Sequence, residues 1–257
     1  EWLIEECLQY GHEFVAMCTA PKRILCCLCS IDLNRSYLES MRDQRPYVIE
    51  LLSVGRMRDM LPGVESFIQH TLKALFGKSF SGAVFIRGYY KSHTLIWLLG
   101  VSLEPCAESY AALLRAPDGS RPWEALAVES LYRGEGAEDD GETSTPGSEL
   151  HHILINFPSS EGVLLHHTLI PRLSAGMRIC WRAAEGQELR NCDSMDSNVV
   201  QVFMWHKNRH LLLEDADNVM SVAITLDRAP IIERSAAVQR NLNRLRGELV
   251  RACTTAD

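Results

Sequence analysis

The residues best able to do chemistry in this chain of 257 are its nine cysteines and nine histidines. Cys26 and Cys29 have the spacing of the thiol pairs that form redox and zinc sites. Both lie in a continuously apolar run, ILCCLCSI, which predicts a buried strand. Residues three apart on a strand face opposite sides, so these two thiols cannot bind one metal ion together. The pattern therefore predicts buried free cysteines, with no metal site and no cofactor.

The segment 166–169 (HHTL) resembles one half of the His-x-Thr motif of the two-histidine phosphodiesterases. Such enzymes place two copies on two strands that face one cleft, where one histidine acts as base and the other as acid. The resemblance implies catalytic roles for His166 and Thr168, and it makes a phosphodiester hydrolase the alternative function. The candidates for the second copy depart from the pattern, because 93–94 (HT) lacks the spacer and 151–154 (HHIL) lacks the hydroxyl residue.

Other chemistries have weaker support in the residues. The sequence contains no nucleophile elbow, zinc-protease motif, phosphate-binding loop or dinucleotide-binding glycine motif. A net charge of −7 makes nucleic acid an unlikely partner, because such binding needs clustered Lys and Arg. The nearest basic and aromatic runs, 87–91 and 178–182, are short, so a nucleic-acid-binding module is the third hypothesis.

Hydrophobic periodicity predicts an α+β fold with a mostly antiparallel sheet. In the N-terminal half, three- and four-residue apolar steps predict helices over 2–18 and 62–76. Apolar runs predict strands over 24–31 and 47–52, and a hairpin formed by 83–89 and 94–103. The C-terminal half is expected to be mostly strand, over 123–132, 150–157, 163–170, 177–183, 199–206, 210–214 and 219–226.

This change of pattern divides the chain into a helix-containing N-terminal lobe, 1–116, and a strand-rich lobe with a terminal helix, 117–257. The two form either separate domains or one continuous domain, because no linker rich in Pro or Gly separates them. Glu214, Asp215 and Asp217 fall between two expected strands, which favours a solvated turn over a cation site.

The terminal helix carries the favoured hypothesis. Its apolar residues recur at steps of four, three and four, the seam of a two-helix contact, and arginines lie beside them. The expected partner-binding residues are Val238, Leu242, Leu245, Leu249, Arg240 and Arg244. We therefore expect a non-catalytic adaptor or assembly subunit that binds other protein subunits through this helix and a sheet edge.

The compartment follows from composition. An odd number of scattered cysteines is typical of a reducing environment, and no charged-then-apolar leader follows Glu1. No apolar run reaches the roughly 18–20 residues that cross a bilayer. The sequence therefore predicts an intracellular protein, cytoplasmic or nuclear, that is not secreted and has no membrane span.

Overall fold

Apolar strands from both halves of the chain join in one large antiparallel sheet. In the computed structural model, which describes residues 8, 10–20, 23–31, 36–76, 80–105, 125, 128, 150–170, 173–194, 197–224 and 226–227, this sheet has eight strands. In sheet order they are β5 (Leu95–Ser102), β4 (Gly82–Ser92), β1 (His12–Ala20), β2 (Arg23–Ser30), β3 (Tyr47–Leu52), β6 (His151–Pro158), β10 (Asn198–His206) and β8 (Gly176–Trp181).

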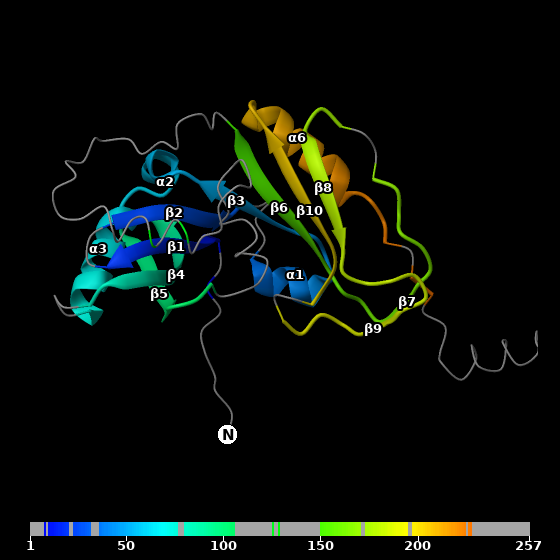
Figure 1. Ribbon diagram of the computed structural model, residues 1–257, viewed down its shortest axis with the longest axis horizontal. Helices are drawn as coiled ribbons and strands as arrows, with labels where there is room; N and C mark the ends of the chain where they lie inside the picture. Colours follow the sequence, from blue (N-terminus) through cyan, green and yellow to red (C-terminus); the bar gives the residue numbers. More distant parts are fainter. Residues whose placement is uncertain are drawn as a thin grey trace, which may run out of the picture.

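A second, smaller sheet and several helices complete the described part. The small sheet has the order β11 (Leu226–Asp227), β7 (Gly162–Leu164) and β9 (Glu188–Leu189). The helices are α1 (Tyr37–Asp43), α2 (Val54–Met60), α3 (Val64–Leu75) and α6 (Arg209–Met220). The large sheet twists, so that β8 runs across the direction of β1 and β2 in Figure 1. Mixed helix and antiparallel strand, rich in strand, is the α+β architecture expected.

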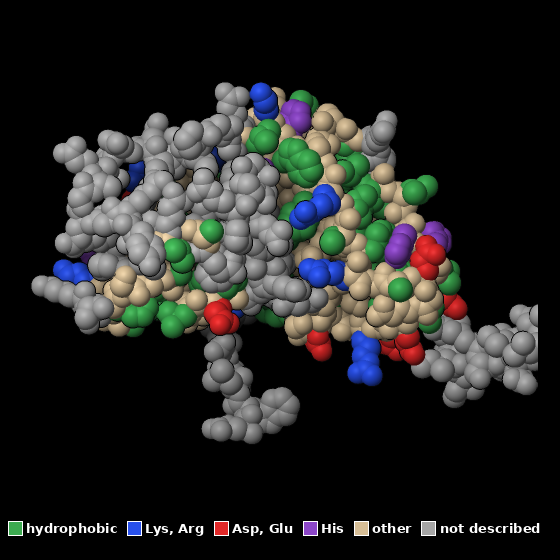
Figure 2. All heavy atoms as spheres, viewed as in Figure 1, with side chains coloured by type: hydrophobic (Ala, Val, Ile, Leu, Met, Phe, Trp, Pro, Cys, Tyr) green, Lys and Arg blue, Asp and Glu red, His purple; other side chains and the backbone are tan. Residues whose placement is uncertain are grey.

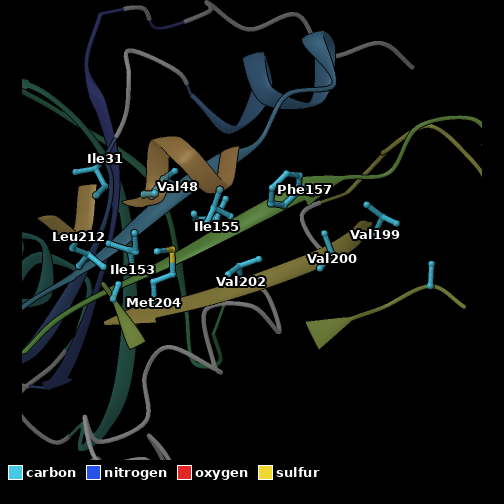
Figure 3. Close-up of a cluster of buried hydrophobic side chains, with 14 of the residues drawn as sticks. Ile31, Val48, Ile153, Ile155, Phe157, Val199, Val200, Val202, Met204 and Leu212 are labelled. Atoms are coloured by element: carbon cyan, nitrogen blue, oxygen red, sulfur yellow. The ribbon is translucent and has the colours of Figure 1, made fainter. Parts of the chain in front are cut away.

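One face of the large sheet is covered by helices. On β1 and β2, α2 and α3 bury alternate residues such as Phe14, Ala16 and Cys27. On β6 and β10, α6 packs its buried residues, among them Leu212, against a second cluster. Figure 3 shows this second cluster, with side chains from the strands converging beneath α6: Val48, Ile153, Ile155, Val202 and Met204.

The opposite face buries the intervening residues of the same strands. Val15, Met17, Leu28, Ile49 and Leu154 form its core. Period-two alternation therefore places two apolar faces on one sheet, which explains why its central strands are mostly apolar at consecutive positions.

Several local expectations are confirmed. The strand at 47–52 is β3, the strand at 24–31 is β2, and the hairpin is β4 with β5. The helix expected at 62–76 is α3, which begins at Val64 after Gly63 in the left-handed conformation.

The helix expected at 2–18 is wrong over the residues that the structure describes, because 12–20 form β1. Residues 14–19 are buried on both faces of the sheet, so every position is apolar or small. An uninterrupted apolar run also has apolar residues at the three- and four-residue spacing of a helix, so only the tertiary contacts distinguish a strand from a helix here.

The strand expected at 210–214 is wrong as well, since α6 occupies that range. Of the strand expected at 219–226, residues 219–220 belong to α6, 221–224 are not strand, and Leu226 begins β11. Asn208 starts this helix, because its side-chain oxygen accepts hydrogen bonds from the backbone N–H groups of His210 (2.9 Å) and Leu211 (3.4 Å). The terminal helix expected from the sequence lies outside the described residues. None of the helices described has the length and apolar character to cross a membrane.

Candidate functional site

A buried carboxylate lies at the centre of the helix-covered face. Glu50 is on β3 between Val48 and Leu52, which belong to the two apolar clusters beneath α6 and beneath α2 and α3. Its side chain is 1% exposed. A buried charge is tolerated only when it is paired and hydrogen-bonded, so the neighbours of Glu50 decide what this position does.

Two guanidinium groups pair with this carboxylate. Arg209, the first residue of α6, donates from Nε to Oε1 (2.9 Å) and Oε2 (3.2 Å) and from Nη2 to Oε2 (2.9 Å). Arg56 of α2 brings its Nη2 within 3.2 Å of Oε1. These contacts with Glu50 raise the pKa of Arg209 above its ordinary value. Charge-assisted, forked contacts of this kind are among the stronger hydrogen bonds in proteins.

A histidine extends the group. Nη1 of Arg56 lies 2.8 Å from Nδ1 of His151, the first residue of β6. Because a guanidinium only donates, Nδ1 accepts, and the neutral ring carries its proton on Nε2. Burial and then the charge of Arg56 hold the pKa of His151 below its ordinary value of 6.5, although Glu50 acts in the opposite direction. His206 of β10 is the cross-strand partner of His151.

We call Glu50, Arg56, His151 and Arg209 the guanidinium cluster. It holds two positive charges and one negative charge, with a neutral imidazole beside them. The Nε atom of Arg56 is buried without a hydrogen-bond partner. The side chains of Arg56 and Arg209 remain 29% and 32% exposed. The cluster therefore presents positive charge toward solvent, which suits a phosphoryl or carboxylate oxyanion.

The opposite face of β8 and β10 carries exposed rings and arginines. Trp205 lies flat on Gly176, where an added Cβ would come within 2.4 Å of the indole. The guanidinium of Arg178 lies 4.7 Å from the centre of the Phe203 ring. Figure 2 shows hydrophobic side chains gathered over this half of the molecule, with basic side chains among them. Trp181 packs against the cluster beneath α6, on the other face of β8, and stacks there on His167 at 4.3 Å, so it does not extend this surface into a continuous basic and aromatic strip.

The residues proposed for phosphodiester hydrolysis are not brought together. His166 is exposed in the segment that follows β7, which ends at Leu164. The hydroxyl of Thr168 donates to the carbonyl of Ala223 at 3.1 Å. The two residues therefore do not share a strand facing a cleft, as the half-motif requires.

The structure describes only some of the other expected site residues. Val238, Leu242, Leu245, Leu249, Arg240 and Arg244 all lie outside the described residues. Cys27 and Cys29 face the helices, and Cys26 faces the other side of the sheet, which confirms that Cys26 and Cys29 point in opposite directions. Asp215 is not in a solvated turn, because it is buried within α6.

Comparison with known proteins defines the fold. No protein-family model and no curated protein matches this sequence. The L-amino acid ligase from Bacillus licheniformis is similar, with a TM-score of 0.53 and 10% identity over 82% of this chain and 54% of that chain. The phosphoribosylaminoimidazole carboxylase ATPase subunit from Aquifex aeolicus matches with a TM-score of 0.45 and 10% identity over 85% and 57%. The chain thus spans about half the length of these structures.

The prediction of a non-catalytic adaptor or scaffold is wrong. The fold of this chain is similar to that of the L-amino acid ligase, an enzyme, so the fold gives no ground for a non-catalytic role. The prediction depended on the lack of local motifs. The absence of local motifs does not exclude an active site, because a site on a large sheet is assembled from residues far apart in sequence.

The guanidinium cluster was missed by sequence reasoning. One signal for it is present, a single Glu in the otherwise apolar strand YVIELL. Its partners carry no such signal, because Arg56 lies in a helix that was not expected and Arg209 fell between the strands expected at 199–206 and 210–214.

Proposed function

We propose that this chain is part of an ATP-dependent ligase, and that the guanidinium cluster holds a phosphoryl or carboxylate oxyanion of its substrates. The similarity to the L-amino acid ligase supports the reaction class. The observation that carries the site is the pair of arginines on one buried carboxylate, each about a third exposed. Ligation driven by ATP develops negative charge on oxygen atoms, and fixed guanidinium groups stabilise such charge.

Titration calorimetry with ATP, ADP and inorganic phosphate tests this proposal. We expect all three anions to bind, and Arg56→Lys to weaken their binding about tenfold, because lysine keeps the charge but loses the forked donors. Arg58→Lys is the matched control. Arg58 lies on the same helix and pairs with Glu65 at the surface, with 2.7 Å between Nε and Oε2. Failure of all three anions to bind, or equal losses in the two variants, contradicts the proposal.

A further inference from the structure

Sites for ATP usually include Mg²⁺, which one or two carboxylates hold together with the phosphate oxygens of the nucleotide. Glu50 is the buried carboxylate of the guanidinium cluster, so it is the first residue to test as a metal ligand. Both of its oxygens already accept hydrogen bonds from Arg209, and Oε1 also forms an ion pair with Nη2 of Arg56 at 3.2 Å. A cation at either oxygen would have to displace an arginine and remain beside two positive charges.

The neighbours of Glu50 in the sheet do not complete a metal site. Its cross-strand partners are Cys29 on β2 and Ile153 on β6. His151 already accepts a hydrogen bond at Nδ1 from Arg56. Within the described ranges, no three His, Cys, Asp or Glu side chains gather closely enough to hold a metal ion. The residues described here therefore do not fit a divalent cation at the guanidinium cluster.

We propose that the guanidinium cluster binds its oxyanion without a divalent cation, with Arg56 and Arg209 supplying the positive charge that a metal would supply. The inference rests on the proposed function and concerns the same site. Glu50 then acts as an internal counter-anion, which orients both arginines while it competes with the ligand for them. Removal of its charge strengthens anion binding, whereas removal of a metal ligand weakens it.

The first experiment uses the wild-type chain and inorganic phosphate as the probe. Affinity is measured by calorimetry in EDTA and again with excess Mg²⁺. We expect the two dissociation constants to agree within about twofold, because no metal is part of the site. Binding seen only with Mg²⁺ overturns the metal-independent site and leaves the proposed ligase function intact. Absence of binding under both conditions overturns the proposed function itself, and this inference with it.

The second experiment tests whether loss of the Glu50 charge strengthens or weakens phosphate binding. Glu50→Gln keeps the shape of the side chain and removes its charge, so phosphate affinity in EDTA should increase about fivefold or more. Glu65→Gln is the matched control, because Glu65 also pairs with an arginine but lies at the surface, and it should leave the affinity unchanged. Weaker binding by Glu50→Gln than by the wild type contradicts the counter-anion role. Circular dichroism of each variant establishes that it is folded.

Discussion

His151 links the guanidinium cluster to the stability of the protein. It faces Arg56, Glu50, Arg209 and His206, and its pKa is held below the ordinary 6.5, first by burial. The unfolded chain therefore binds a proton at a higher pH than the folded chain does. This contribution to stability is fully present above the unfolded pKa and is lost as pH falls toward the folded one. We expect His151→Gln to flatten the decrease in urea midpoint between about pH 7.5 and about pH 5.5.

The control for this titration is His166→Gln. His166 is exposed and lies outside the cluster, so its variant should follow the wild-type pH dependence. If the urea midpoints of His151→Gln and the wild type fall in parallel as pH is lowered, burial of the neutral His151 ring does not contribute to the pH dependence of stability.

At the scale of the element, α6 is held in place by a buried carboxylate. Asp215 is 8% exposed and its Oδ2 accepts hydrogen bonds from the hydroxyl of Ser174 (2.6 Å) and the backbone N–H of Ala175 (2.7 Å). Both donors lie just before β8, so the contact ties α6 to the edge of the sheet. We expect Asp215→Asn to lower the free energy of unfolding by about 1–3 kcal/mol, because an amide oxygen in the place of Oδ2 accepts the same two hydrogen bonds without the negative charge that strengthens them. Urea denaturation measures the change.

Asp217→Asn provides the comparison on the same helix. Asp217 is exposed, and substitution there should change the free energy of unfolding by less than about 0.5 kcal/mol. Equal effects of the two substitutions would show that the loss at 215 comes from helix charge, and not from the tie to Ser174 and Ala175.

At the scale of the whole molecule, the pairing of β3 with β6 joins segments from both halves of the chain in one sheet. These strands pair through Val48 with Ile155 and Ile49 with Leu154, and they connect segments from the two lobes expected at 1–116 and 117–257. The division into lobes stays a prediction, but a continuous sheet should unfold cooperatively. Ile155 is fully buried beneath α6. We expect Ile155→Ala to lower the stability of the whole sheet by about 2–5 kcal/mol.

Hydrogen exchange followed by mass spectrometry distinguishes one transition from two. Peptides from β1 and from β10 should lose protection at the same urea concentration, in the wild type and in Ile155→Ala alike. Separate transitions, with only β10 shifted by the substitution, would instead indicate two lobes that unfold independently.

Local signals in the sequence determined several elements. The apolar run at 47–52 became β3, the amphipathic stripe at 62–76 became α3, and the paired runs at 83–89 and 94–103 became a hairpin. Each signal lies within a short segment, where periodicity and a tight turn are enough to specify the structure. The segment 12–20 differs, because burial on both faces of a sheet produces apolar steps that also fit a helix.

Only the tertiary structure decided the site. Glu50 meets Arg209 across 159 positions of sequence, and it does so because β3 lies beside β6 and α6 packs on β6 and β10, so that the first residue of α6 reaches β3. Nothing in the residue types specifies which arginine pairs with which carboxylate, since any guanidinium can bind any carboxylate. Strand order and helix placement, set by the burial of apolar faces over the whole chain, make that choice.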